Sequence, residues 1–351
     1  MRLNAFERRF QTEEDCVEAF RTVREKHLPD CPICGAHQYK WILKKLSFEC
    51  LQCRKRISLT AGTVMEKSKI PLLDWFYTIH LMTSIKQVLS AKEVQYQLSY
   101  KSYEPVWLMM MKLRDIMGKR DKEYTLGRWV EVDEAFFPTI INENMRGRPL
   151  KQGLGSERQS KVLVIAKSIP IVNLLMSITS TSSADLSKAV DLYSRSKRYS
   201  VNSVVYYVKM FVLEDLGAET IDQLMEESVV QDTVVVSDGF KSHKNFKERF
   251  NHLIMTEGDE PEDVVKNHLP WVHIVTGECR NAITAIHRQI DKRFLQLYLN
   301  EYCWKFNRRI FRKAEIFEHD LFYRLLNISA KYTSTIKWRD FPCDDEDDED
   351  E

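Results

Sequence analysis

Apolar residues recur with helical spacing in the first third of the chain. Val17, Phe20 and Val23 fall on one face of residues 12–26, which predicts a short amphipathic helix. Residues 71–84 are rich in apolar side chains and predict a second helix. The chain is therefore expected to begin with helices on both sides of a segment that has a different pattern.

Two further helices are expected over residues 91–98 and 104–117, joined by a turn at 99–102. Ser90 precedes the first helix and Glu93 follows three residues later, which is the spacing of a capping box. Two short helices joined by a tight turn are typical of a helix-turn-helix. Short helices of this kind also form ordinary cores, so both interpretations stay open.

From Gly127 onward the pattern changes to runs of strand length. Strands are expected at 128–136, 161–167, 172–179, 204–213 and 233–237, with a helix at 218–227 before the last of them. A surface insertion is expected at about 181–202 and a polar loop at 258–267, followed by the segment 269–280 and then a long helical region to about 315. Strands followed by a helix and another strand predict an α/β domain with a mixed sheet.

Two of these apolar runs contain an aspartate. Asp133 lies inside residues 129–137, and Asp238 ends the run that begins at Thr233. A buried carboxylate is costly unless something pairs with it or binds it. Two aspartates on neighbouring buried strands can share Mg²⁺ or Mn²⁺, because these ions prefer oxygen ligands. The alternative is that each aspartate caps a turn.

Cysteine spacing predicts a metal site near the N-terminus. Four of the eight cysteines form two C-x-x-C pairs: Cys31, Cys34, Cys50 and Cys53. Strand candidates at 39–43 and 46–49 lie between the pairs, as in a zinc ribbon. Four thiolates leave no open position for water, so Zn²⁺ would be structural there. Unligated thiols are the alternative.

Charge is distributed unevenly along the 351 residues, a length that suggests two or three domains. The formal net charge of +1 becomes +9 once the eight acidic residues 344–351 are left out. A basic body predicts a polyanionic partner, and the tail from 340 is expected to be disordered. Cations that could contact a DNA backbone are Arg54, Lys55, Arg56, Lys92 and Lys101. No secretion signal or membrane span is visible, so a cytoplasmic protein is expected.

Taken together, these motifs resemble a known family. In order they are the cysteine pairs, the capped helix-turn-helix, VEVDE at 130–134, VSDG at 236–239, LPWVH at 269–273 and YLNEYCWKFNRR at 298–309. The order is similar to that of bacterial insertion-sequence transposases of the zinc-ribbon DDE type, often called the ISXO-two-like group. The likeness covers roughly residues 5–315.

The resemblance implies an RNase H-like catalytic domain that cuts and joins DNA at the terminal inverted repeats of the element. It identifies Asp133 and Asp238 as the first two catalytic acids, and His273 as the third position, where other members have Glu, Asn or His. Arg280 takes the place of a lysine that most members have. The resemblance also implies catalytic Mg²⁺ or Mn²⁺, double-stranded DNA as partner, a homo-oligomer on DNA, and a location at the bacterial nucleoid.

Several assignments stay open. Glu278 is a rival to His273 as third ligand, although five residues along a helix rotate it by about 140° from His273. Arg280 would hold the target phosphate or be a surface cation. Glu134 is expected on the strand side opposite Asp133 and is not counted as a ligand. In a basic cluster near the end of the helical region, Arg308 and Arg309 are expected to contact DNA.

The expected architecture is therefore a multidomain α/β protein. Its parts are an N-terminal helix (1–28), a zinc ribbon (29–60), a helical DNA-binding domain (61–120), an RNase H-like domain (127–315) and an acidic tail (340–351). The expected function is transposition through metal-dependent strand cleavage and strand transfer. The alternatives are a catalytically silent DNA-binding protein and a structure-specific nuclease.

Overall fold

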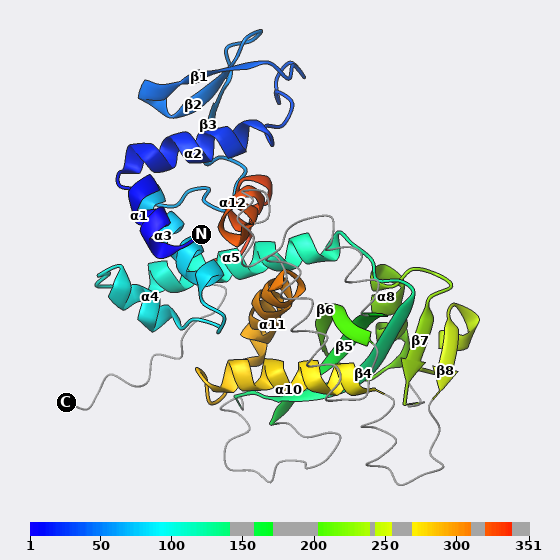
Figure 1. Ribbon diagram of the computed structural model, residues 1–351. Coiled ribbons are helices and arrows are strands. Elements are labelled where there is room, and N and C mark those ends of the chain that lie inside the picture. Colours follow the sequence, from blue (N-terminus) through cyan, green and yellow to red (C-terminus); the bar gives the residue numbers. More distant parts are fainter. Residues whose placement is uncertain (141–157, 171–202, 239–242, 255–268, 310–319, 339–351) are drawn as a thin grey trace, which may run out of the picture. The chain divides into compact units, whose positions relative to one another are not determined.

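The computed structural model describes residues 1–140, 158–170, 203–238, 243–254, 269–309 and 320–338. These residues belong to two compact units, which Figure 1 shows with the colours of the sequence. The first unit contains residues 1–119 and the described residues from 320 onward, and the second contains residues 120–319. The C-terminal segment thus folds with the N-terminal third of the chain.

The first unit carries a three-stranded antiparallel sheet. Its strands are β1 (Tyr39–Ile42), β2 (Ser47–Cys50) and β3 (Arg56–Ser58), in that order across the sheet. The strands expected at 39–43 and 46–49 are confirmed. β3 was not expected, because three residues are too few to show an alternating pattern.

Helices make up the rest of the first unit: α1 (Leu3–Arg9), α2 (Glu13–Glu25), α3 (Leu72–Ser84), α4 (Ala91–Gln97), α5 (Glu104–Lys122, ending in the second unit) and α12 (Leu321–Lys331). The helices expected at 12–26, 71–84, 91–98 and 104–117 are confirmed. Ser90 Oγ accepts a hydrogen bond from the Glu93 N–H at 3.1 Å, as an N-cap does. A complete capping box is formed by Thr12 and Asp15 at the start of α2.

Aromatic rings form the core of the first unit. Phe6 of α1 stacks on His80 of α3 with 4.5 Å between ring centroids. Phe322 of α12 contacts Phe6, Phe10 and Phe76, with centroids 5.5 to 5.7 Å apart. All five rings are buried. Because such pairs add to the stabilisation from burial itself, α12 is an integral part of this core.

The second unit is built on a mixed sheet of β4 (Trp129–Pro138), β5 (Gln159–Pro170), β6 (Ser203–Leu213), β7 (Val234–Ser237) and β8 (Asn251–Ile254). The order is β6-β5-β4-β7-β8. Neighbours among β4, β5 and β6 are antiparallel, whereas β7 runs parallel to β4, and β8 parallel to β7. The mixed sheet and four expected strands are confirmed, and β8 was not expected. The strand expected at 172–179, the insertion at about 181–202 and the loop at 258–267 lie outside the described residues.

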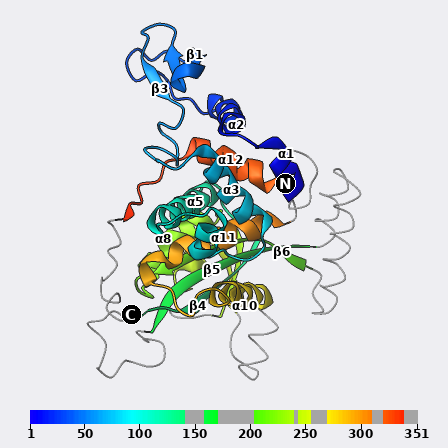
Figure 2. The ribbon, with the colours of Figure 1, turned by 90° about the vertical axis from the view of Figure 1, so that its left-hand side faces the viewer.

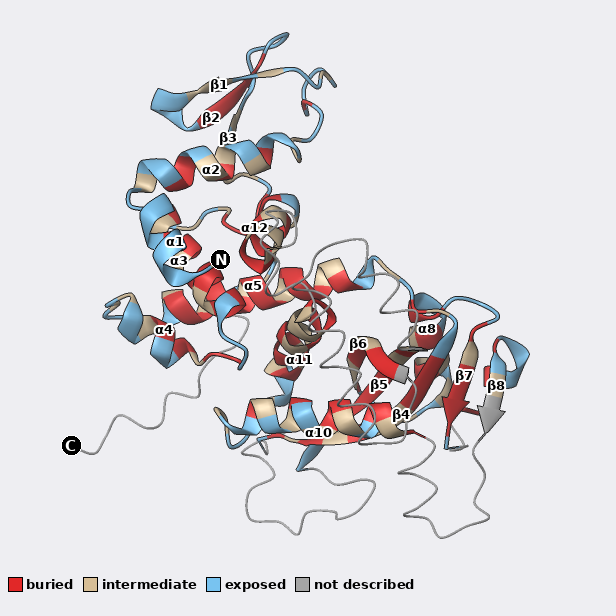
Figure 3. Cartoon of the chain, viewed as in Figure 1, coloured by how far each residue is buried: buried red, intermediate tan, exposed pale blue. Residues whose placement is uncertain are grey.

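Helices cover both faces of this sheet (Figures 1 and 2). They are α8 (Ala218–Ser228), α10 (Pro270–Thr284) and α11 (Lys292–Asn307). On one face, Val130 and Val132 of β4 pack with Ile221 and Met225 of α8 in a buried cluster, red in Figure 3. α10 packs on β4 and β5, and α11 on β6. The helix expected at 218–227 is confirmed. The long helical region expected after residue 280 contains the end of α10 and all of α11 as separate helices.

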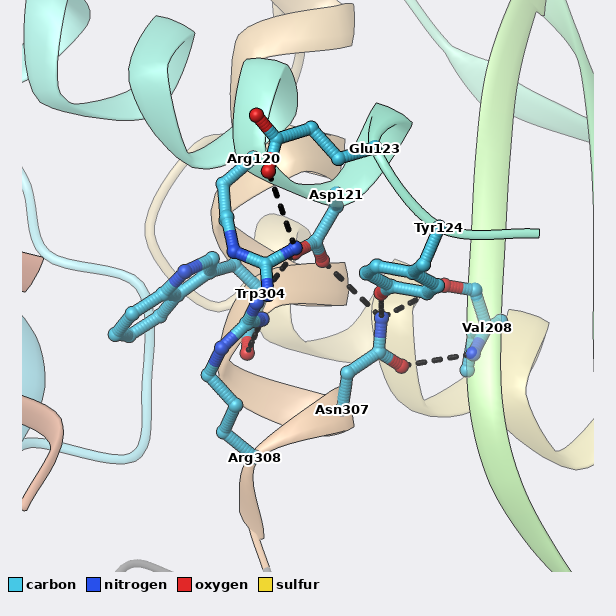
Figure 4. Close-up of polar contacts among 8 residues, drawn as sticks. All are labelled: Arg120, Asp121, Glu123, Tyr124, Val208, Trp304, Asn307 and Arg308. Atoms are coloured by element: carbon cyan, nitrogen blue, oxygen red, sulfur yellow. Dashed lines mark hydrogen bonds and ion pairs between the residues drawn. The ribbon is translucent and has the colours of Figure 1, made fainter. Parts of the chain in front are cut away.

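Side chains of α11 form hydrogen bonds with the backbone of β6, the outermost strand on that side of the sheet among the described residues. Gln296 donates to the Met210 carbonyl at 3.0 Å and accepts from the Val212 N–H at 2.8 Å. Asn307 accepts from the Val208 N–H at 2.7 Å and donates to the Val208 carbonyl at 3.0 Å (Figure 4). An edge strand exposes unpaired backbone groups that can pair with another chain. These two amides therefore occupy part of the edge of β6.

Candidate active site

Asp133 lies near the middle of the sheet, on β4. Its Oδ1 accepts a hydrogen bond from the Glu134 N–H at 2.8 Å. Burial, reinforced by the negative charges of Asp238 and Glu134, raises the pKa of Asp133 to about 7. The carboxylate is therefore held where a positive charge would be strongly stabilising.

Asp238 follows directly after β7, which is the parallel neighbour of β4. Glu131 on β4 pairs with Val236 on β7, so Asp133 and Asp238 each stand two residues further along the same direction. The Asp238 side chain is 40% exposed, and its charge acts on Asp133. Two acids 105 positions apart in the sequence thus meet because their strands are parallel neighbours.

His273 comes from the first turns of α10. Its Nε2 lies 3.8 Å from Asp133 Oδ2, and its side chain is 40% exposed. Burial lowers the pKa of His273, opposed by the charge of Asp238, which favours a neutral ring with an available nitrogen. The structure brings Asp133, Asp238 and His273 together.

Glu278 and Arg280 have other surroundings. Glu278 is exposed, and its charge acts on Tyr302 and Arg309. Arg280 donates to the Phe136 carbonyl at 2.8 Å, and its guanidinium lies 5.6 Å from the centre of the Phe137 ring. Arg280 is thus tied to β4, and its contact with a target phosphate stays a prediction.

Glu131, which sequence reasoning missed, fixes the start of α10. Its Oε2 accepts hydrogen bonds from the N–H groups of Trp271 (2.8 Å) and Val272 (3.1 Å). Burial raises its pKa to about 7, and these two hydrogen bonds oppose the rise. Glu131 and Asp133 lie on the same face of β4. The two hydrogen bonds to Glu131 hold the start of α10 on that face, and His273 in the first turns of α10 therefore lies beside Asp133. The available signal was an acid two residues before Asp133 in the same apolar run.

His243 was also missed, as was its contact with Glu134, which had been expected only to lie opposite Asp133. His243 Nε2 lies 3.1 Å from Glu134 Oε1, and its Nδ1 lies 3.5 Å from Asp238 Oδ1. Burial would lower the pKa of His243, but the contacts with Asp238 and Glu134 outweigh it and raise the pKa to about 9. A positively charged imidazole therefore lies between two carboxylates. The spacing of five residues between Asp238 and His243 gives no signal of this by itself.

A scan against protein-family models matches residues 125–307 to the ISXO2-like transposase domain. The match covers more than half of the chain. It contains the three residues that the structure brings together, Asp133, Asp238 and His273, and the residues around them, Glu131, Glu134 and His243. The chain belongs to the ISXO2-like transposase family. A search of curated proteins gave no match, and neither did a search of solved structures. Among the described helices of the transposase, none is long and apolar enough to cross a membrane.

The four cysteines of the transposase come together in the first unit. Their Sγ atoms all lie within 4.8 Å of one another, and no other group of three or more potential ligands among the described residues is as close. Backbone N–H groups of Ile33 and Cys34 lower the pKa of Cys31 to about 6, which favours the thiolate that a metal binds. The cluster could hold one zinc ion.

Glu49 forms ion pairs with basic residues that lie next to the cysteine cluster in the sequence. Arg56 donates to it at 2.8 Å, and Lys40 and Arg54 lie 3.1 and 3.5 Å from it. Hydrogen bonds from Arg56 and Lys40 lower the pKa of Glu49 to about 2. Further along the chain, Lys55, Lys92 and Lys101 are exposed, and Lys92 lies over the ring of Tyr103.

Arg308 and Arg309, which were expected to contact DNA, bind groups of the protein itself. Arg308 is 6% exposed, donates to Asp121 at 2.7 Å and to the Trp304 carbonyl at 3.0 Å (Figure 4). Arg309 donates to the carbonyls of Val205 and Phe306. Both guanidiniums thus bind acceptors within the protein, which favours a structural role for these two arginines.

Proposed function

We propose that the chain is a DNA strand transferase that cuts at the ends of an insertion sequence and joins them to target DNA. The observation that carries this is the convergence of Asp133, Asp238 and His273 within a domain that matches the transposase family. The strand order β6-β5-β4-β7-β8, with β4 to β6 antiparallel and β7 and β8 parallel, supports an RNase H-like fold.

The proposed metal ligands suit a divalent cation. Asp133 and Asp238 repel each other, and the resulting rise in the Asp133 pKa is relieved when a cation lies between them. Carboxylate oxygens suit Mg²⁺, and the imidazole of His273 makes the set more tolerant of Mn²⁺. When bound, two such ions would activate the attacking oxygen and stabilise the leaving oxygen of an in-line displacement at phosphorus.

The residues around the ligands have supporting roles. Glu131 anchors the N-terminus of α10 on β4, so that His273 remains within reach of Asp133. Arg280, bonded to the Phe136 carbonyl, is a cation beside the same strand and is a candidate for holding the target phosphate. Glu278, whose charge acts on Tyr302 and Arg309, is not proposed as a ligand.

The first unit is proposed to bind DNA. A zinc ribbon on the four cysteines and the α4–α5 pair as a helix-turn-helix would contact the terminal repeats. Support comes from the geometry of the cysteine cluster and from the exposure of Lys55, Lys92 and Lys101. Nothing favours the alternative of a catalytically silent DNA-binding protein, because both aspartates and His273 are present and lie together.

Metal-dependent cleavage tests this proposal. Labelled DNA carrying one end of the element would be incubated with the full chain and Mg²⁺ or Mn²⁺, with a shuffled sequence as control. We expect a nick at the junction of element and flank, and its loss in Asp133→Asn. Cutting of both DNAs at the same rate would indicate a structure-specific nuclease instead. Tight binding of the end with no cutting would contradict the proposed chemistry.

A further inference from the structure

His243 lies between β4, which carries the proposed metal ligand Asp133, and the second proposed ligand, Asp238. Its ring is 1% exposed, and its two nitrogens face Glu134 of β4 and Asp238 after β7. Glu134 is the neighbour of Asp133 in the sequence, but alternation along β4 puts it on the opposite strand face. One imidazole therefore connects the surroundings of both aspartates.

We propose that His243 and Glu134 act together as positioning residues that hold the Asp238 carboxylate in its metal-binding orientation. The proposal rests on the proposed function, because it assumes that Asp238 binds the catalytic metal. Partners that fix the direction of a ligand typically change metal affinity by about 10–100-fold when they are removed.

Asp238 needs such a partner more than Asp133 does. Asp133 lies within the ladder between β4 and β5, where it pairs with Val164. Asp238 follows Ser237, the last residue of β7. The Asp238 carboxylate is 40% exposed, whereas that of Asp133 is 17% exposed. A side chain in that position loses rotamer freedom on binding a metal unless it is already oriented.

The ring of His243 is itself held by the core. It stacks on Phe246, with 4.8 Å between centroids and 22° between ring planes. Phe246 is 1% exposed and belongs to the buried cluster that includes Val130 and Val132 of β4. The link from Glu134 through His243 to Asp238 is thus built on the same strand as Asp133. It ties the position of the second ligand to that of the first.

The chain offers a matched control in His252 of β8. Its ring contacts the same Phe246, with centroids 5.3 Å apart, and its Nε2 lies 2.9 Å from Ser237 Oγ. Replacing His252 disturbs the same aromatic group without removing an imidazole from between the two carboxylates. A purely structural effect of losing a histidine here should therefore be similar in both variants.

Mn²⁺ binding to the full chain without DNA tests the proposal, with free Mn²⁺ followed by electron paramagnetic resonance. The variants are His243→Ala, Glu134→Gln and His252→Ala. We expect affinity to fall about 10–100-fold in His243→Ala, less in Glu134→Gln, which keeps an acceptor, and less than twofold in His252→Ala. End cleavage by His243→Ala should recover as Mn²⁺ is raised, because only the position of a ligand is lost.

Three results would overturn the proposal in distinguishable ways. If wild type cuts and His243→Ala and Glu134→Gln bind Mn²⁺ as wild type does, the positioning role is wrong and the transposase function stands. If wild type neither binds Mn²⁺ nor cuts, the proposed function is wrong. The positioning role is then wrong as well, because it assumes that Asp238 binds the metal. If His243→Ala does not fold, as judged by circular dichroism, Glu134→Gln decides, and unchanged affinity in that variant contradicts the proposal.

Discussion

Buried charges determine which basic residues of this transposase can reach DNA. Arg308 lies in a run of basic residues, which resembles a nucleic-acid contact in the sequence. In the structure it forms an ion pair with Asp121, and both side chains are less than 10% exposed. Lys55, by contrast, is exposed beside the cysteine cluster. Residue type predicts a charge, but only burial shows which partner it has.

Replacing Arg308 with alanine tests its structural role. We expect Arg308→Ala to lower the free energy of unfolding by about 3–5 kcal/mol, because Asp121 would remain buried without its partner. Lys101→Ala, on an exposed residue, should change it by less than about 0.5 kcal/mol. Urea unfolding of the full chain measures both. Unchanged stability with weaker DNA binding in Arg308→Ala would restore the DNA-contact interpretation.

His80 should make the stability of the first unit depend on pH. Burial, together with the positive charge of the N-terminus, lowers its pKa to about 4. The folded state then binds fewer protons than the unfolded state between pH 6.5 and 4, so stability is lost as the pH falls through this window. The loss attributable to His80 is about 3 kcal/mol by pH 4.

Urea unfolding at pH 7 and pH 4 checks this prediction. The difference between the two pH values should be about 3 kcal/mol smaller in His80→Gln than in wild type. His37→Gln is the control, because His37 is 69% exposed. Acid release of a metal bound at the cysteine cluster would affect all three proteins alike and would cancel in the comparison. Equal pH dependence in His80→Gln and wild type would show that His80 is not the titrating group.

At the scale of elements, carboxylates from elsewhere in the chain anchor two helices. Glu131 binds the first free N–H groups of α10, behind Pro270. Glu13 does the same for α3, behind Pro71, accepting from Leu72 at 2.7 Å and Leu73 at 2.8 Å. Proline supplies no N–H, so the next two N–H groups receive the carboxylate.

Removing the anchor should loosen α10 specifically. We expect Glu131→Ala to cost about 1–3 kcal/mol, because two buried N–H groups lose their acceptor. Glu131→Gln keeps one acceptor oxygen and should cost less. Hydrogen exchange should become faster in a peptide covering 269–284 and stay unchanged in α3, which Glu13 anchors. Unchanged exchange in α10 would mean that other contacts determine its position.

Much of the sheet could be predicted because its strands are long and apolar. β4, β5 and β6 each bury apolar side chains over ten or more residues, so their pattern is strong. β8 has four residues, and α1 has seven, which is too short for a clear period. The pairing of β4 with β7 depends on tertiary packing, and no local pattern encodes it.

Some residues of the candidate site could likewise be predicted from the sequence and others could not. Asp133 and Asp238 stood out as charges in apolar runs, and His273 through a motif that resembles the family. Glu131, Glu134 and His243 did not, because their roles depend on which groups they meet across the fold. Local spacing identifies acids that are costly to bury, whereas the partners that hold them are visible only in three dimensions.

At the scale of the whole molecule, the two units depend on different stabilising interactions. The first unit combines an aromatic core, completed by α12 from the other end of the chain, with the cysteine cluster. The second is a sheet covered by helices on both faces. Removing a metal should therefore affect the two units unequally.

Zinc removal tests this division. We expect one zinc ion per chain, lost in Cys34→Ser but retained in Cys16→Ala, which alters a buried cysteine outside the cluster. Because metal binding supplies folding free energy to such small sites, chelation should expose β1 to β3 to hydrogen exchange. β5 should stay protected. Equal zinc content in wild type and Cys34→Ser would contradict a four-cysteine site.

The most direct test of the central claim is cleavage of a labelled element end by His273→Ala and Glu278→Ala, each compared with wild type in Mg²⁺ and Mn²⁺. The two residues lie on the same helix, but only His273 faces Asp133. We expect His273→Ala to lose at least 100-fold in cleavage rate while it still binds the DNA end, and Glu278→Ala to cut like wild type. Loss of cutting in Glu278→Ala alone would contradict an Asp133, Asp238 and His273 centre.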